Sequence, residues 1–297
     1  VGWANDYDCN LDNFSPATLL NDNIGLLKTL GHDSCFVIGH DFGSPVAAYS
    51  TLARPDIFRA VVLMSAPFGG IPDQGNEETE HQTASDIHEE LAKLSPPRKH
   101  YQWYYSTEHA NDDMLNCEQG VHAFLRAYYH HKSADWKGNK PHPLKSWTAK
   151  ELEKMPTYYV MENNQTMAQT VAKEMPSQQH IAACTWLPDS ELGFYAATYS
   201  LTGFQGGLQH YRIATSGAFA SELRKLRNRT INVPSAFIAG ENDWGIYQKP
   251  GAFEKMQEEA LTDMRGCYLV PNAGHWVQQE QPDKVSRLLT QFIKDIN

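Results

Sequence analysis

The sequence predicts an α/β fold: a mostly parallel, doubly wound sheet interrupted by a long helical insertion. Four short apolar runs are typical of strands buried on both faces of a parallel sheet. They lie within SCFVIG (34–39), RAVVLMSAP (59–67), NVPSAFIAGENDW (232–244) and RGCYLVPNAGHW (265–276). The β–α–β order at the start of the chain indicates parallel strands. The long region between the second and third runs has helical patterns and no continuous run of valine and isoleucine.

Two helices flank the first strand. The first covers 15–30, with Ser15 as the N-cap, Pro16 at the first helical position and Gly31 closing the helix. Its apolar residues recur at helical spacing. The second helix follows the strand over 44–55 and has a proline near its start.

The expected organisation is one core domain with an inserted cap. Residues 1–68 and 222–297 are assigned to the α/β core, and residues 69–221 to a helical cap rich in tyrosine, tryptophan, histidine and glutamine. The segment PDKVSRLLTQFIKDI closes the chain as an amphipathic helix. A length of 297 residues suits such a core with a large insertion.

Composition narrows the classes of partner and the compartment. The formal net charge of −10 argues against nucleic acid and anionic membranes as partners. There is no apolar run of 18 residues, so no transmembrane helix is expected. Five scattered cysteines without a C-x-x-C pair favour a reducing compartment, and a cytoplasmic location is expected. Sequons at Asn13, Asn164 and Asn228 leave secretion open, and a homodimer is also left open.

Three candidate catalytic residues follow predicted strands. CFVIGHDFGSPVAA has the outline of a strand–turn–helix nucleophile elbow, with Asp41 where a serine is usual. Gly39 and Gly43 are expected to be required there because a Cβ at either position would clash. Asp243 and His275 follow later strands, and ligands bind at the carboxyl ends of such strands. The order nucleophile, acid, histidine is typical of an α/β-hydrolase triad.

The chain resembles the epoxide hydrolase family of the α/β-hydrolase fold over essentially its whole length. The segments that carry the resemblance are GHDFGSPVAA, LMSAPFGG, TGFQGGLQHYR, AGENDW and NAGHWVQQEQP. The first and last are also similar to haloalkane dehalogenases. TGFQGGLQHYR is more discriminating, because it resembles the cap segment that supplies a ring-opening tyrosine in epoxide hydrolases.

The resemblance implies a role for each site residue. Asp41 attacks an epoxide carbon and forms an alkyl-enzyme ester. Tyr211, from TGFQGGLQHYR, and a second cap tyrosine hydrogen-bond the epoxide oxygen. KHYQWYYS resembles the segment of that second tyrosine, with Tyr101 as the best match. His275, oriented by Asp243, activates the water that hydrolyses the ester to a vicinal diol.

Further residues are expected to complete the site. The backbone N–H of Phe42 forms half of an oxyanion hole. Trp103 and Tyr104 are expected to contact substrate, and Tyr104 is also the alternative to Tyr101 as the second ring-opening tyrosine. The many aromatic residues of the cap favour a small hydrophobic epoxide as the substrate. No metal-ligand spacing or phosphate loop occurs, so no metal and no cofactor are expected.

Two other functions remain open. A haloalkane dehalogenase usually carries a tryptophan after the nucleophile to bind halide, and the Phe42 ring has no N–H to donate. The other is an inactive protein of hydrolase fold. A haloacid-type dehalogenase would require an arginine beside the nucleophile, which is absent.

The resemblance also implies that the core is truncated on its N-terminal side. Only 40 residues precede Asp41, whereas the family has four strands and an H-G-x-P loop before its nucleophile strand. The opening VGWANDYD resembles the loop after the fourth strand. CFVIG would then be an exposed edge strand, a position that soluble proteins protect. The chain is therefore expected to fold poorly or to have little activity alone.

Overall fold

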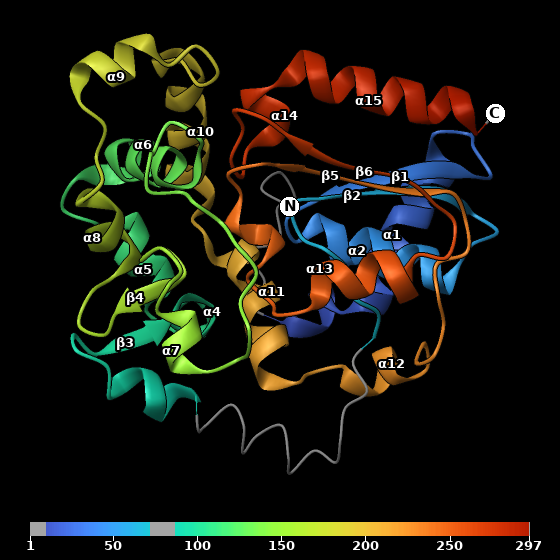
Figure 1. Cartoon of the computed structure of the whole chain (residues 1–297), viewed down its shortest axis with the longest axis horizontal. Coiled ribbons are helices and arrows are strands. Elements are labelled where there is room, and N and C mark those ends of the chain that lie inside the picture. Colours follow the sequence, from blue (N-terminus) through green and yellow to red (C-terminus); the bar gives the residue numbers. More distant parts are fainter. Residues whose placement is uncertain (1–9, 72–86, 297) are drawn as a thin grey trace. The chain divides into compact units, whose positions relative to one another are not determined.

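The computed structural model describes residues 10–71 and 87–296, which divide into two compact units. Among these residues, the core unit comprises 12–71, 140–146 and 219–296. The cap unit comprises 10–11, 87–139 and 147–218. The short segment 140–146 therefore belongs to the core unit, although it lies inside the insertion expected from the sequence. The opening segment interpreted as a loop lies outside the described residues. Figure 1 shows the elements of both units.

The core unit contains a four-stranded parallel sheet with the strand order β1-β2-β5-β6. Its strands are β1 (Cys35–His40), β2 (Phe58–Met64), β5 (Ser235–Gly240) and β6 (Met264–Val270). The four predicted strands and their parallel arrangement are confirmed. Within the described residues β1 is an edge strand, and the Ile38 side chain on it is 45% exposed.

Helices cover both faces of this sheet (Figure 1). On β2, Val61 and Leu63 pack into one apolar cluster, which includes residues of α2 (Gly43–Ala53). The alternate residues Val62 and Met64 pack into the other cluster, which includes residues of α15 (Pro282–Asp295). Successive side chains of a strand point to opposite faces, so burial of both faces requires a continuous apolar run.

The first helix, α1 (Pro16–Thr29), has the predicted caps. The Ser15 hydroxyl accepts a hydrogen bond from the backbone N–H of Thr18 at 3.1 Å, and Pro16 occupies the first turn. Gly31 follows the helix with a φ of 79°, which costs glycine little. Leu27 anchors α1 in a cluster with residues at the start of β2.

The remaining elements of the core unit are short, except for the last helix. They are η1 (Leu11–Phe14, shared with the cap unit at its first residue), α12 (Ala220–Arg224), η2 (Trp244–Ile246), α13 (Ala252–Lys255), η3 (Met256–Ala260) and α14 (Val277–Glu280). The predicted closing helix is confirmed as α15. It buries Val285 and Phe292 on one face, seven residues and thus about two turns apart.

The cap unit is mostly helical, as predicted for this part of the chain. Its helices are α4 (Tyr101–Ser106), α5 (Ala110–Leu115), α6 (Gly120–Lys132), α7 (Ala149–Leu152), α8 (Met167–Ala172), α9 (Gln178–Ala183), α10 (Asp189–Thr202) and α11 (Gln205–Ser216). A pair of antiparallel strands, β3 (Arg98–His100) and β4 (Val160–Glu162), was not expected. Each strand has three residues, too few to produce a recognisable alternation of apolar and polar positions.

In the part of the chain that the structure describes, no helix combines the length and the apolar character needed to cross a membrane.

Candidate active site

The turn between β1 and α2 has the geometry of a nucleophile elbow. Asp41 sits at its apex with a φ of 54°, a left-handed conformation that is uncommon for a residue with a side chain. A Cβ at Gly39 would overlap the carbonyl group of Gly43, so glycine is required at 39. The expectation for Gly43 is wrong: a Cβ there has no neighbouring atom within 4 Å. The close approach is made by the backbone of Gly43, which any residue would supply.

The other two predicted residues follow neighbouring strands of the same sheet. Asp243 lies after β5 and caps η2, where its carboxylate accepts the backbone N–H of Gly245 at 2.7 Å. His275 lies on the loop after β6. The two loops approach so closely that a Cβ at Gly240 would overlap the carbonyl of Gly274. Parallel strands end at one edge of the sheet, which brings these loops beside the elbow.

The structure brings the three predicted residues into contact. His275 Nε2 lies 2.7 Å from Asp41 Oδ2, and His275 Nδ1 lies 3.3 Å from Asp243 Oδ1. The His275 and Asp243 side chains are almost fully buried, whereas the Asp41 side chain is 38% exposed. One imidazole thus connects a solvent-accessible carboxylate to a buried one, and the accessible carboxylate occupies the position of a nucleophile.

The buried carboxylate is stabilised in its charged form. Burial alone would raise the pKa of Asp243, but attraction to His275 and its hydrogen bond act in the opposite direction. Hydrogen bonds from Ser65 and Gly245 lower the pKa further, and the net shift is downward. Asp243 is therefore the group suited to hold a positive charge on the imidazole.

Two residues at this site were not identified from the sequence. Ser65, directly after β2, places its hydroxyl 2.5 Å from Asp243 Oδ2 and 2.9 Å from His275 Nδ1. His40 places Nε2 2.7 Å from the carbonyl oxygen of His275. Burial and the nearby His275 lower the pKa of His40, which favours a neutral ring. The signal available for Ser65 was its place at a strand end in LMSAPFGG; none distinguished His40.

The two expected ring-opening tyrosines come together within the cap unit. The rings of Tyr101 and Tyr211 make an edge-to-face contact with centroids 5.7 Å apart. Tyr105 contacts both rings, at 5.8 Å from Tyr101 and 4.9 Å from Tyr211. Helices α4 and α11 supply these side chains. The local resemblance of two distant segments thus selected residues that are neighbours in space.

The other two cap residues expected to contact substrate have structural contacts. The Tyr104 hydroxyl donates to Asp113 Oδ2 at 3.0 Å, and burial raises the pKa of Tyr104. The Trp103 ring packs edge-on against His88 at 4.3 Å and His100 at 5.1 Å. The Tyr101 hydroxyl accepts a hydrogen bond from the side-chain amide of Gln102 at 3.3 Å.

Phe42 directly precedes α2, so its N–H belongs to the positive end of that helix. Among residues 10–71 and 87–296, no group of three or more histidine, cysteine, aspartate or glutamate side chains has a geometry suited to a metal ion.

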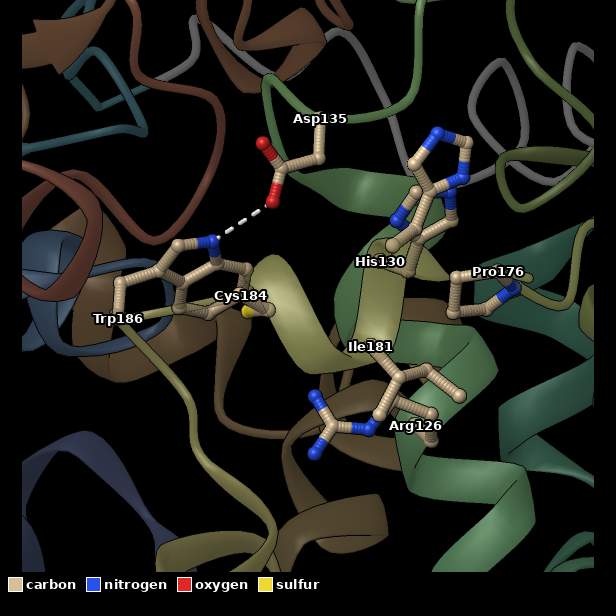
Figure 2. A pocket seen from close by; sticks show the side chains of 8 residues that line it. Arg126, His130, Asp135, Pro176, Ile181, Cys184 and Trp186 are labelled. Carbon is tan, nitrogen blue, oxygen red and sulfur yellow. Dashed lines mark hydrogen bonds between the residues drawn. The ribbon is translucent and has the colours of Figure 1, made fainter. Parts of the chain in front are cut away.

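A small pocket lies inside the cap unit, apart from all the residues assigned above (Figure 2). Its lining residues are Arg126, His130, Asp135, Pro176, His180, Ile181, Cys184 and Trp186. The Trp186 Nε1–H donates to Asp135 at 2.9 Å, and Arg126 donates to the Leu187 carbonyl and to Asp189. These contacts join the helices and loops of the cap unit to one another.

Comparison with protein families identifies the family of the chain. Residues 7–282 match the family described as the alpha/beta hydrolase fold. The chain belongs to this family, in agreement with its parallel sheet, its elbow and its triad order. The predicted fold class is therefore confirmed.

Several individual relatives within this family are epoxide hydrolases. Epoxide hydrolase B of Mycobacterium tuberculosis is 28% identical over 280 residues, which cover 93% of this chain and 76% of the relative. An epoxide hydrolase of Caballeronia sordidicola is 24% identical over 284 residues, covering 96% and 74%. The solved structure of an epoxide hydrolase from an endophytic Streptomyces is similar in fold, with a TM-score of 0.73, 24% identity and coverage of 96% and 75%. The resemblance to the epoxide hydrolase family is confirmed.

Proposed function

We propose that the protein is an epoxide hydrolase that opens a small hydrophobic epoxide to a vicinal diol through an ester on Asp41. The observation that carries the proposal is the arrangement at the elbow. A carboxylate sits at the nucleophile position, and one imidazole contacts it at 2.7 Å while its other nitrogen faces buried Asp243. The names of the relatives support epoxides as the substrate class.

The chemistry favours a carboxylate over a serine for this substrate. When aspartate attacks an sp³ carbon, the carbonyl of the resulting ester belongs to the enzyme. Water then attacks that carbonyl, releases the diol and restores the carboxylate. A serine attacking the same carbon would leave an ether, which water does not cleave under these conditions. An enzyme with Asp41 as the nucleophile can therefore complete repeated catalytic cycles, whereas a serine nucleophile would remain alkylated.

Hydrolysis of the ester requires a general base. His275 accepts a proton from the attacking water at Nε2, the nitrogen that faces Asp41. The positive charge that develops on the ring is stabilised by Asp243, whose lowered pKa keeps it ionised. The N–H of Phe42 is the proposed donor to the oxyanion formed at the Asp41 carbonyl.

Ring opening requires a donor for the epoxide oxygen. Tyr101 and Tyr211 are proposed to hydrogen-bond this oxygen as the C–O bond breaks, because a phenol can stabilise or protonate an alkoxide. Their contact within the cap unit supports a paired role. Trp103 and Tyr104 are proposed as residues of the substrate-binding surface. The reaction needs no metal or other cofactor.

The proposal is tested by incubating the purified chain with an aryl epoxide and, separately, with an alkyl halide. Diol formation that is lost in Asp41→Asn is expected. A single turnover in ¹⁸O-water should place ¹⁸O in the Asp41 carboxylate and not in the diol, because water attacks the enzyme's carbonyl.

Other outcomes would contradict the proposal in different ways. Halide release without diol formation would indicate a dehalogenase. Direct labelling of the diol in a single turnover would exclude the ester. Absence of both activities in folded protein would indicate an inactive member of the family.

A further inference from the structure

We propose that Ser65 is a positioning residue for the hydrolytic step, in which its hydroxyl links Asp243 to His275 and fixes the orientation of the imidazole. The inference deepens the proposed function and rests on it. It assigns Ser65 to the step in which His275 activates water to hydrolyse the ester, and not to the alkylation step.

The contacts of the hydroxyl define a bridge. Ser65 Oγ lies 2.5 Å from Asp243 Oδ2 and 2.9 Å from His275 Nδ1. The direct distance from His275 Nδ1 to Asp243 Oδ1 is longer, at 3.3 Å. The serine oxygen is therefore the nearer partner of Nδ1. Asp243 therefore orients the imidazole of His275 partly through the Ser65 hydroxyl.

Donor and acceptor chemistry fixes the direction of this bridge. An ionised carboxylate can only accept, so the single hydroxyl proton of Ser65 is donated to Asp243. The serine oxygen then presents lone pairs to His275 and accepts the proton on Nδ1. This arrangement selects the ring form that is protonated at Nδ1. Nε2, on the side of Asp41, is left to take the proton from water.

The backbone holds Ser65 in an unfavourable conformation to make these contacts. Its φ is 70°, in the left-handed region that glycine adopts more readily than serine. The residue is fully buried, and its backbone N–H donates to the Ile238 carbonyl on β5 at 3.1 Å. Gly245 leaves room for the hydroxyl, because a Cβ there would lie only 2.7 Å from Ser65 Oγ. Glycine at position 65 would relieve the backbone but lose the bridge.

The effect of Ser65 on the carboxylate agrees with this role. Burial raises the pKa of Asp243, and His275 makes the largest contribution that lowers it. The hydrogen bond from Ser65 lowers this pKa further. The hydroxyl thus helps to keep the carboxylate charged and holds the imidazole beside it.

The decisive experiment compares Ser65→Ala with Ser65→Gly in single-turnover kinetics on an aryl epoxide. Both variants lose the hydroxyl, but only glycine suits the positive φ. We expect ester hydrolysis to slow by about tenfold or more in both, because a hydrogen bond to a charged group is lost. Alkylation of Asp41 should change much less. The ester should accumulate as an added mass on the intact protein.

Controls separate positioning from folding and from the proposed function. Ser235→Ala removes another buried hydroxyl, at the start of β5, whose bond is to the Asp263 carbonyl. It should leave both rates unchanged. Wild-type hydrolysis in Ser65→Gly would overturn the inference, and so would equal slowing of alkylation and hydrolysis. If Ser65→Ala fails to fold, Ser65→Gly decides alone.

A measurement without substrate keeps the two proposals distinguishable. The proton on His275 Nδ1 should give a low-field NMR resonance in the wild type, which His275→Gln removes. The resonance should move in Ser65→Gly, because its nearest acceptor is gone. An unmoved resonance would overturn the role of Ser65 whatever the activity. If the resonance moves in Ser65→Gly but the wild-type protein forms no diol, the bridge is supported and the epoxide hydrolase proposal is refuted.

Discussion

At the scale of single residues, the candidate site depends on a buried charge that is matched by its neighbours. Asp243 is almost fully buried, yet its net pKa shift is downward because of His275 and the hydrogen bonds around it. A buried carboxylate without such partners would take up a proton. The ionised form is what the proposed base requires.

The first prediction concerns this carboxylate. In Asp243→Asn the side chain keeps its shape but loses the charge that stabilises protonated His275. We expect ester hydrolysis to fall by about 100-fold or more, since general-base catalysis is typically worth 10²–10⁴-fold. Steady-state kcat on an aryl epoxide measures this effect, with intact-protein mass reporting accumulated ester. Asp263→Asn, at an exposed ion pair with Arg265, is the matched control. Unchanged kcat in Asp243→Asn would contradict the mechanism.

Asp41, Asp243 and His275 can be predicted from the sequence because each follows an apolar strand in a recognisable local pattern. Ser65 gave no comparable signal. Serine is common after strands, and the contacts of Ser65 reach 178 and 210 positions along the chain. Tyr101 and Tyr211 were selected by local resemblance, and their contact is visible only in three dimensions. The role of Gly43 was misjudged because the pattern does not show which of two glycines supplies the Cβ clash.

At the scale of elements, the elbow joins β1 to α2 through one close backbone approach. Strand and helix can pass each other only if the residue two before Asp41 has no Cβ. The geometry that presents Asp41 therefore depends on the missing Cβ of Gly39.

The second prediction uses the two glycines as a matched pair. Gly39→Ala should destabilise the protein by about 2 kcal/mol or more, or prevent folding, because its Cβ would overlap backbone atoms that cannot move independently. Gly43→Ala should be neutral or slightly stabilising, since its Cβ meets no atom within 4 Å and alanine favours helix. Urea denaturation followed by circular dichroism measures both. Equal effects of the two substitutions would show that the close approach is absent in solution.

A third prediction concerns the N-cap of α1. In Ser15→Ala the backbone N–H of Thr18 loses its acceptor, and the expected cost is about 1 kcal/mol in the free energy of unfolding. The same urea titration measures it. Ser221→Ala, an exposed serine in α12, serves as the control. A loss no larger than that of the control would contradict the cap.

The strands of the core unit were predictable because burial on both faces leaves a continuous apolar run in the sequence. The β3–β4 pair of the cap unit could not be predicted in this way. Its three-residue strands are held by pairing between residues about 60 positions apart, and no local pattern encodes that pairing.

At the scale of the whole molecule, both units bury ionisable side chains. The core unit buries a charged network at the ends of its strands. The cap unit buries neutral histidines: burial lowers the pKa of His100 and of His131 to about 3 in each case. The His131 ring is fully buried against Trp136 and Tyr158. Both of its nitrogens lack a hydrogen-bond partner among the described residues.

These histidines predict a loss of stability of the cap unit in acid. An unfolded histidine takes up its proton near pH 6.5, but the folded ring resists protonation until about pH 3. The stabilising contribution is therefore complete above pH 6.5 and is lost as the pH falls toward 3. Each such histidine gives a slope of about 1.4 kcal/mol per pH unit in that window. Between pH 6.5 and pH 5 this amounts to about 2 kcal/mol.

His131→Leu tests this reasoning. Leucine has a similar volume and no group to protonate, so the variant should be as stable as the wild type at pH 7, or more stable. On going to pH 5 it should lose about 2 kcal/mol less than the wild type. Urea titrations at the two pH values measure the difference, and amide hydrogen exchange in α6 locates it in the cap unit. His109→Gln, whose ring is 64% exposed in the same unit, is the control and should follow the wild type. Equal acid sensitivity of His131→Leu and the wild type would show that the ring is not held neutral by burial.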